Sequence, residues 1–256
     1  MPVVCSARQV ACAAGGDFSD FADPLNPEPD PLPEHRRAVV FDLDGTLVDT
    51  AADIHAVLAE VLVEAGLPAP DLAAVRAMIG DGARVLVERA LAAIGEPTDA
   101  ATVDQFHRRF TARYAELPCR HSVPYAGAVE LLAALRRDGW RLGLCTNKPH
   151  AATLGLLAAL NLDGALDSVI GGDRLPGIRK PDARHLAAVL GELDVATGAA
   201  VMVGDSRNDL LTARALGVPC ILVSFGYTNV PARDLGADAV IDRLDEVPEA
   251  LRRIGA

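Results

Sequence analysis

The segment FDLDGTLVDT, at residues 41–50, constrains the fold of this chain more than any other. An apolar run over residues 38–41 stops abruptly at Asp42 and Asp44, a pattern typical of a buried parallel strand. Open α/β sheets bind ligands at the carboxyl ends of their strands, so both carboxylates are candidates for a ligand site. A strand followed by an Asp-Gly turn is common without any function. The spacing Asp-x-Asp-Gly-Thr is more specific, because one carboxylate can act as a nucleophile and the other as an acid and base.

Segments with strand and helix patterns alternate from residue 125 onward. Strands are predicted over 141–145, 167–170, 200–204, 219–224 and 239–241. Helices are predicted over 127–138, 150–160, 183–192, 207–216 and 245–254. This alternation predicts an α/β fold built on a doubly wound, parallel, Rossmann-like sheet.

Residues 50–118 show helical periodicity without a strand pattern, and they interrupt the strand-rich part of the chain. In the first helix the apolar residues recur at helical spacing, and Thr50 with Asp53 has the pattern of a capping box. A second helix is predicted over 71–79, and two more follow the loop at 80–82. We therefore predict a small α-helical cap domain over 50–118, inserted into a core formed by 37–49 and 119–256.

Residues 1–36 form the least globular part of the sequence. Five prolines stand among acidic residues over 17–34, and such a composition cannot bury a core. A flexible, Pro-rich N-terminal extension is therefore expected. A signal peptide is not expected, because residues 1–16 carry a single basic residue and no sustained apolar run.

The overall charge and the cysteines narrow the class of protein. A net charge of −11 argues against a nucleic-acid partner, although local cations or a metal ion can still attract an anionic substrate. The five cysteines are scattered and form no Cys-x-x-Cys pair, which indicates neither a zinc site nor a disulfide framework. A reducing cytoplasm fits this pattern, and no apolar run approaches the ~20 residues of a membrane span. The sequence leaves the oligomeric state open.

Polar side chains follow several of the predicted strands, where parallel strands would bring them to one edge of the sheet. They are Asp42, Asp44, Thr146, Asn147, Lys180, Asp205 and Asp209. Taken singly, each has an ordinary explanation as a helix cap, a turn or a solvated surface residue. Occurring together in this order, they indicate a site.

The residue types at this edge indicate phosphoryl chemistry. Clustered carboxylates repel one another and require a cation, and hard oxygen ligands suit Mg²⁺. Mg²⁺ and Lys180 can offset the repulsion between an attacking carboxylate and a phosphate, while Thr146 and Asn147 donate to phosphoryl oxygens. Attack by Asp42 would form an aspartyl-phosphate, and Asp44 would protonate the leaving oxygen and later activate water.

Four segments resemble the motifs of the haloacid dehalogenase superfamily of phosphohydrolases: FDLDGTLVDT, LCTNKP, the Lys180-Pro181 loop and VGDSRNDLLTA. The resemblance covers about residues 37–256 and includes the helical cap. It implies that Asp42 is the nucleophile and Asp44 the acid and base. Mg²⁺ would be held by Asp42, Asp205 and the Asp44 backbone carbonyl. Phosphate would be bound by Thr146, Asn147 and Lys180, with Asp209 as a supporting carboxylate. The dehalogenases of this superfamily lack the second carboxylate of the first motif, so Asp44 favours phosphoryl transfer.

Within the superfamily, three further segments are similar to those of bacterial phosphoglycolate phosphatases: IGDGARVLVERAL at 79–91, GGDRLPGIRKPD at 171–182 and SFGYTNVPARDLGADAVID at 224–242. The loop before Lys180 is slightly longer than expected from that similarity. The resemblance implies hydrolysis of 2-phosphoglycolate to glycolate and phosphate. Its carboxylate would be bound by the cap loop through Gly80, Gly82 and Arg84, although Arg84 can equally be a solvated surface residue.

Three other functions stay open from the sequence. The chain can be another capped phosphatase, acting on pyrophosphate or a nucleotide. It can be a sugar-phosphate mutase of the same fold, although the cap motif of those mutases is not visible. A phospho-receiver domain also uses strand-end aspartates, Thr and Lys, but it needs neither the Asp-x-Asp pair nor a long helical insertion.

Overall fold

The computed structural model describes residues 36–116 and 119–255. Apart from Arg36, the predicted flexible extension over 1–36 lies outside these described residues. None of the helices described is long and apolar enough to cross a membrane.

The centre of the fold is a six-stranded sheet in which all neighbouring strands are parallel. Its strands, in spatial order, are β5 (Ser168–Ile170), β4 (Arg141–Cys145), β1 (Ala38–Phe41), β6 (Ala200–Gly204), β7 (Cys220–Val223) and β8 (Ala239–Ile241). β1 lies between β4 and β6 and is buried along its whole length, which explains its uninterrupted apolar run. The predicted doubly wound parallel sheet is confirmed.

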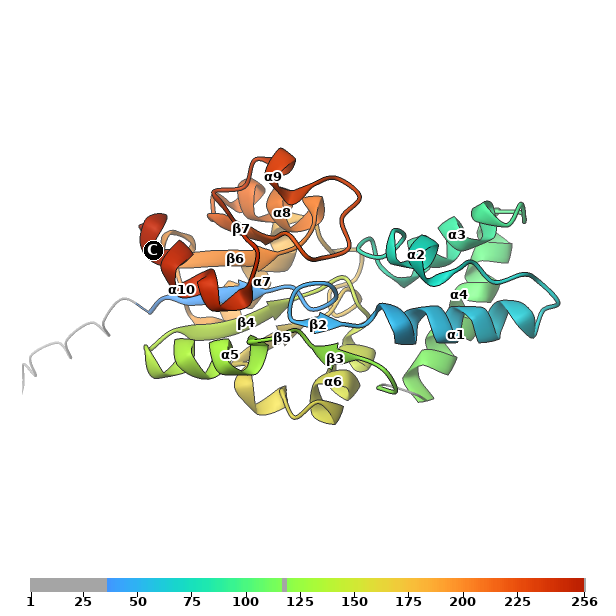
Figure 1. Cartoon of the computed structure of the whole chain (residues 1–256), viewed down its shortest axis with the longest axis horizontal. Helices are drawn as coiled ribbons and strands as arrows, with labels where there is room; N and C mark the ends of the chain where they lie inside the picture. The colour runs from blue at the N-terminus through green and yellow to red at the C-terminus, as the bar shows by residue number, and fades with distance from the viewer. Residues whose placement is uncertain (1–35, 117–118, 256) are drawn as a thin grey trace, which may run out of the picture. The chain divides into compact units, whose positions relative to one another are not determined.

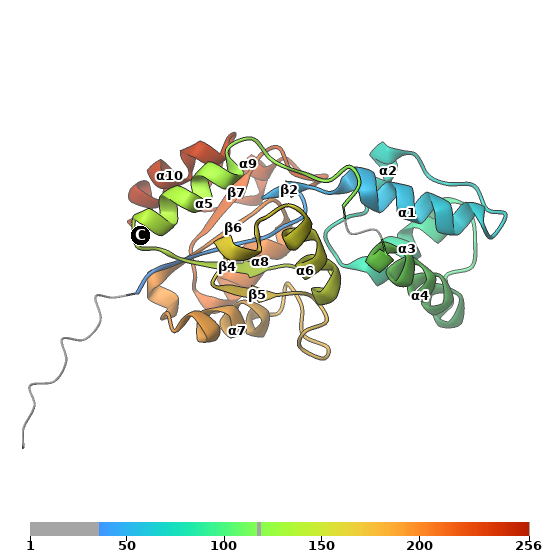
Figure 2. The ribbon, with the colours of Figure 1, turned by 90° about the horizontal axis from the view of Figure 1, so that it is seen from below.

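Helices cover both faces of this sheet (Figures 1 and 2). One face packs against α5 (Ala128–Arg137), α6 (His150–Ala159) and α10 (Val247–Arg253), and the other against α7 (Ala183–Leu193), α8 (Arg207–Leu216) and the short α9 (Ala232–Leu235). Successive strand residues point to opposite faces, so Val39 and Phe41 join the first layer while Val40 joins the second. Short 3₁₀ turns lie at Asp163–Ala165, Thr197–Ala199 and Leu244–Glu246.

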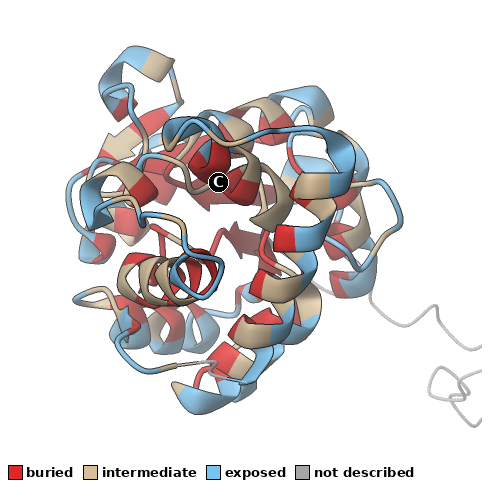
Figure 3. Cartoon of the chain, turned by 90° about the vertical axis from the view of Figure 1, so that its right-hand side faces the viewer, coloured by how far each residue is buried: buried red, intermediate tan, exposed pale blue. Residues whose placement is uncertain are grey.

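The predicted helical insertion consists of four helices, which we call the cap helices: α1 (Ala51–Val63), α2 (Leu72–Arg76), α3 (Ala83–Ala93) and α4 (Ala100–Glu116). Their apolar faces form a separate hydrophobic cluster, to which Ala152 of α6 also belongs. In Figure 3 the buried residues gather on the strands and on the inward sides of the helices. The second helix is shorter than predicted, since it ends at Arg76 rather than at residue 79. Because the four helices share a core of their own, we propose that they form a cap domain.

Two short strands connect the cap helices to the parallel sheet. β2 (Val48–Asp49) pairs antiparallel with β3 (Val123–Pro124), where the chain leaves for the cap helices and where it returns. A strand of two residues is too short to show an alternation of apolar and polar side chains, so this pairing could not be predicted from the sequence.

The predicted capping box at the start of α1 is wrong. Thr50 occupies the N-cap position, but its side chain accepts no hydrogen bond from a helix N–H. Its hydroxyl instead donates to Asp44 Oδ1 at 2.7 Å. The carboxylate of Asp53 accepts hydrogen bonds from the backbone N–H groups of Arg120, His121 and Ser122, and from the Ser122 hydroxyl. Partners in the returning chain have therefore replaced the local cap.

Candidate active site

The seven predicted core residues come from the segments that follow four neighbouring strands, β5, β4, β1 and β6. Asp42 and Asp44 follow β1, Thr146 and Asn147 follow β4, and Asp205 follows β6. Lys180 lies on the loop before α7, and Asp209 lies in the first turn of α8.

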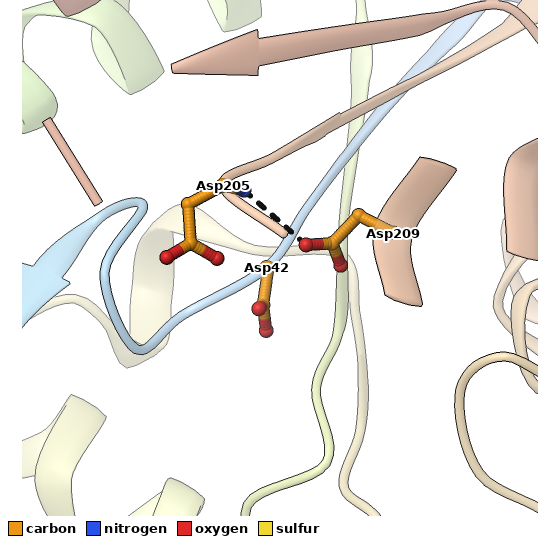
Figure 4. Close-up of side chains that lie close together, drawn as sticks. All are labelled: Asp42, Asp205 and Asp209. Carbon is orange, nitrogen blue, oxygen red and sulfur yellow. Dashed lines mark hydrogen bonds between the residues drawn. The ribbon is translucent and has the colours of Figure 1, made fainter. Parts of the chain in front are cut away.

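Three of these carboxylates form a buried cluster (Figure 4). Asp42, Asp205 and Asp209 each offer an oxygen, and these oxygens lie within 4.8 Å of one another. Burial raises the pKa of Asp42 to about 7, although the nearby Lys180 lowers it. Burial, together with the charges of Asp209 and Asp42, raises the pKa of Asp205 well above its ordinary value. This repulsion indicates that the cluster is built to hold positive charge.

Lys180 supplies one positive charge to the cluster. Its ammonium nitrogen lies 2.8 Å from Asp42 Oδ1 and 2.6 Å from Asp209 Oδ1, and its side chain is 1% exposed. Burial lowers the pKa of Lys180, but the two carboxylates outweigh burial and raise it. The lysine is therefore a permanent cation beside the first carboxylate.

Asp209 is a structural member of the cluster, because both of its oxygens are committed. Oδ1 faces Lys180, while Oδ2 accepts from the backbone N–H groups of Asp205 and Ser206 and from the Ser206 hydroxyl. The bond from the Ser206 N–H belongs to a capping box at the start of α8, in which the Ser206 side chain in turn accepts from the Asp209 backbone N–H. A Cβ at residue 204 would collide with the Asp209 carboxyl, so glycine is required there.

Asp42 and Asp205 are better placed to bind a metal ion. The hydrogen bonds and ion pairs of Asp42 involve Oδ1, which contacts the Leu43 N–H and Lys180, and Asp205 accepts the Tyr227 N–H through Oδ2. Within the described part of the chain, this leaves the second oxygen of each carboxylate for a cation. Two hard oxygen donors with waters completing the shell fit Mg²⁺.

Two glycines allow the chain to pass close to Asp205. Gly45 has a φ of 83°, and a side chain on it or on Gly226 would collide with the Asp205 side chain. The loop after β7 therefore holds Asp205 from one side, and the turn after β1 holds it from the other.

Asp44 belongs to a second group of polar residues, on the side of the cap helices. Its Oδ1 accepts from the Thr50 hydroxyl at 2.7 Å and lies 3.2 Å from the Lys148 ammonium nitrogen. Lys148 also donates to the Tyr114 hydroxyl at 2.9 Å, and the Lys148 residue is 5% exposed. Burial lowers the pKa of Lys148, but Asp44 and Tyr114 outweigh it and raise the pKa overall.

Lys148 was not among the site residues predicted from the sequence. The residue follows Thr146 and Asn147 directly, so its place after a buried strand was a usable signal. Its interaction with Tyr114, which is remote in the sequence, left no such signal.

Thr146 and Asn147 are both buried, and both line the same cavity as Asp42. The Asn147 amide nitrogen donates to the carbonyls of Gly80 and Lys180, each at 3.0 Å, and its oxygen accepts from the Lys180 N–H. The side chain therefore fastens the cap loop to the Lys180 loop. To donate to a phosphate, as the sequence suggested, the Asn147 amide would have to give up one of these carbonyls.

A cavity lies between the strand ends and the cap helices. On one side it is lined by Asp42, Asp44, Thr146, Asn147, Lys148, Pro149 and Ala152, and on the other by Ile54, Ile79, Gly80, Gly82, Ala83, Leu86, Phe110, Thr111 and Tyr114. The first set is mainly polar and the second mainly apolar. A small molecule held here would therefore present its polar reacting end to the sheet.

The three predicted cap residues are separated by the structure. Gly80 and Gly82 line the cavity, and Gly82 is the N-cap of α3 without a side-chain capping bond. Arg84 lies elsewhere: its Nε donates to Asp104 at 2.9 Å, and Nη1 lies 3.8 Å from Glu88. In this conformation Arg84 ties α3 to α4 instead of lining the cavity.

Comparison with known proteins identifies the family. The haloacid dehalogenase-like hydrolase family matches residues 36–217. A phosphoglycolate phosphatase of Caulobacter vibrioides is 45% identical over 212 residues, covering 83% of this chain and 89% of that protein. A phosphoglycolate phosphatase of Rhodospirillum rubrum is 45% identical over 211 residues, covering 80% of this chain and 87% of that protein. A crystal structure described as a predicted phosphoglycolate phosphatase from Haemophilus somnus has a TM-score of 0.77 at 29% identity. The match covers 84% of this chain and 97% of that one. The chain therefore belongs to the haloacid dehalogenase-like hydrolases and is an enzyme of that family.

Proposed function

We propose that this enzyme hydrolyses a small phosphomonoester with the help of Mg²⁺, and that its preferred substrate is 2-phosphoglycolate. The observation that carries the proposal is the buried Asp42 carboxylate, held 2.8 Å from Lys180 beside two further aspartates. The choice of substrate is supported by the names of the relatives that are 45% identical.

Asp42 is the proposed nucleophile. One of its oxygens attacks phosphorus, the bond from phosphorus to the leaving oxygen breaks, and Asp44 gives a proton to that oxygen. Water then attacks the phosphorus of the aspartyl-phosphate while Asp44 accepts a proton from it. The bond between phosphorus and Asp42 breaks, and inorganic phosphate is released. The free Asp42 carboxylate and the protonated Asp44 are thereby restored.

The surrounding residues hold charge during both steps. Lys180 and the Thr146 hydroxyl would contact the phosphoryl oxygens, and Asn147 would keep the cap loop close to them. Asp42, Asp205 and the Asp44 backbone carbonyl would hold Mg²⁺, which offsets the repulsion between a carboxylate and a phosphate. Asp209 would keep Lys180 in place without touching the substrate.

The cap helices are proposed to select the leaving group, because the polar groups after the strands are committed to phosphate and metal. Gly80 and Gly82 bring backbone groups to the cavity at the start of α3, where the helix dipole favours an anion. The surrounding apolar residues limit the size of what fits.

Phosphate release from a panel of phosphoesters with Mg²⁺ tests this function. The panel contains 2-phosphoglycolate, pyrophosphate, a nucleoside monophosphate, a hexose phosphate and an aryl phosphate. The highest kcat/KM is expected for 2-phosphoglycolate. A preference for pyrophosphate or a nucleotide would overturn the substrate, and no phosphate release from any of them would overturn the reaction. Conversion of a hexose phosphate to its isomer would instead indicate a mutase. The cytoplasmic location stays a prediction.

A further inference from the structure

We propose that Lys148, held by Tyr114 of the cap helix α4, binds the carboxylate on the substrate's leaving group. This inference rests on the proposed phosphatase function and adds a specificity residue to it. It replaces Arg84, which the sequence suggested, by a cation that lines the cavity.

The first support is the distribution of positive charge around the cavity. Among the described residues that line it, Lys148 is the one cationic side chain. Lys180 is held by Asp42 and Asp209, and Arg84 is paired with Asp104. An anionic leaving group that enters the cavity therefore meets the Lys148 ammonium.

The second support is the number of hydrogens on that ammonium. A lysine has three N–H donors. The Lys148 ammonium donates to Asp44 Oδ1 at 3.2 Å and to the Tyr114 hydroxyl at 2.9 Å, and it makes no third hydrogen bond within the described residues. Since the residue is 5% exposed, a third acceptor from the substrate would satisfy a nearly buried donor.

The third support is the distance from the reacting atoms. In the proposed reaction Asp44 gives its proton to the leaving oxygen, and in 2-phosphoglycolate a single methylene group separates that oxygen from the carboxylate. A carboxylate so close to Asp44 lies within the neighbourhood of the Lys148 ammonium, which itself contacts Asp44. The cation is thus at the position that the short substrate requires.

Tyr114 fixes the position of this cation. Its hydroxyl accepts a hydrogen bond from Lys148, and its ring centroid lies 4.4 Å from the Lys148 ammonium nitrogen. The tyrosine is 3% exposed. The proposed carboxylate site is therefore completed by a cap helix, and its lysine follows a strand of the sheet. Substrate selection and cap position are coupled through this contact.

The decisive experiment compares two substrates that differ only in the carboxylate. Ethyl phosphate has a methyl group where 2-phosphoglycolate has its carboxylate, and both need a proton on an alkyl leaving oxygen. Lys148→Met keeps an unbranched apolar stem of the same length as far as Cε and removes the ammonium group. Its kcat/KM for 2-phosphoglycolate is expected to fall about 10- to 100-fold more than its kcat/KM for ethyl phosphate.

Glycolate supplies a second readout. As the product that carries the carboxylate, it is expected to inhibit hydrolysis of ethyl phosphate by the wild-type enzyme, and to lose most of that inhibition with Lys148→Met. Arg109→Met is the matched control, because Arg109 lies on the same helix as Tyr114 but pairs with Glu64. This control is expected to change both kcat/KM values equally and little.

Equal losses on both substrates would overturn the proposal, because Lys148 would then act only through Asp44. Unchanged kinetics would also overturn it. A wild-type enzyme that hydrolyses both substrates equally well would refute carboxylate binding while leaving the phosphatase function standing; one that hydrolyses neither would refute the function itself. If Lys148→Met fails to fold, Tyr114→Phe tests the same site. Its kcat/KM for 2-phosphoglycolate is again expected to fall more than its kcat/KM for ethyl phosphate, but by a smaller factor than with Lys148→Met.

Discussion

At the scale of single residues, the position of Asp42 is determined by its immediate neighbours. Its Oδ1 accepts the Leu43 N–H at 2.7 Å and faces Lys180, so the carboxylate is held in one orientation. The neighbouring carboxylates repel the negative charge of Asp42; Lys180 offsets part of this repulsion, and a metal ion would offset more of it. Asp44, two residues later, has a different set of partners and can carry a different role.

Asp42→Asn is expected to abolish turnover and leave the fold intact. The amide has nearly the shape of the carboxylate but cannot attack phosphorus, and it removes one repelling charge from the cluster. The melting temperature without Mg²⁺ is therefore expected to stay the same or rise slightly. A phosphate-release assay beside a thermal melting curve checks both expectations, and near-normal turnover would exclude Asp42 as the nucleophile.

Gly226→Ala is expected to weaken Mg²⁺ binding about 10- to 100-fold, because the new Cβ would displace the Asp205 side chain. The Mg²⁺ concentration that gives half-maximal activity measures the effect. Gly191→Ala is the control, since a Cβ on this glycine of α7 meets nothing within 4 Å. An unchanged Mg²⁺ requirement for Gly226→Ala would show that Asp205 does not bind the metal.

At the scale of elements, side chains from distant segments secure the connection between the sheet and the cap helices. The Tyr227 hydroxyl accepts the N–H groups of Thr50 and Ala51 and donates to Asp49, so a residue of the loop after β7 caps the start of α1. On the other side of the same connection, Asp53 accepts four hydrogen bonds from the returning chain. These contacts fix the direction in which α1 leaves the sheet.

Asp53→Asn is expected to lower the free energy of unfolding at pH 7 by about 1–3 kcal/mol, because a buried charged acceptor is replaced by an amide. Burial raises the pKa of Asp53, but its hydrogen bonds with Ser122, Arg120 and His121 outweigh burial and lower it. A lowered pKa contributes stability above the ordinary value of 3.8, and this contribution disappears as the pH falls below that value.

The difference between wild type and Asp53→Asn should therefore be constant from neutral pH down to about pH 4, and shrink below it. Urea unfolding at several pH values measures it. Glu249→Gln, which affects an exposed ion pair with Arg252, serves as a control and should change stability by less than about 0.5 kcal/mol. A pH-independent difference would contradict the role of the Asp53 charge.

At the scale of the whole molecule, the order of the strands explains the place of the site. The chain moves from β1 to β4 and β5 on one side, and then crosses to β6, β7 and β8 on the other. Ligands of open α/β sheets bind where the strand order reverses, and in this sheet that point lies between β1 and β6. The candidate active site lies at these strand ends, with the cap helices forming the other wall of the cavity.

Mg²⁺ is expected to raise the melting temperature of the whole enzyme, since it binds the folded carboxylate cluster and not the unfolded chain. At about 100 times its dissociation constant the gain is roughly 2.7 kcal/mol, which corresponds to roughly 5–10 °C. Asp205→Asn should lose most of this shift.

Ca²⁺ is expected to stabilise the fold but not to support turnover, because it prefers a looser shell with more ligands. Full activity after exhaustive chelation would contradict the metal assignment.

The sequence by itself determined the layout of the molecule. The apolar run before Asp42 predicted a buried strand, and the alternation after residue 125 predicted a parallel sheet with helices on both faces. Because parallel strands end at the same edge, the gathering of Asp42, Lys180 and Asp205 followed from their places after strands. Periodicity and strand ends are local properties, which is why they can be read from one chain.

Only the tertiary structure decided which side chains meet across long separations in the chain. Lys148 meets Tyr114, and Asp53 meets Ser122 instead of forming the predicted local cap. Arg84 stands at the predicted end of the cap loop, yet its guanidinium lies against Asp104. A sequence pattern specifies the position of a residue along an element, but the direction of a long side chain depends on which charges and acceptors the packed elements bring within its reach.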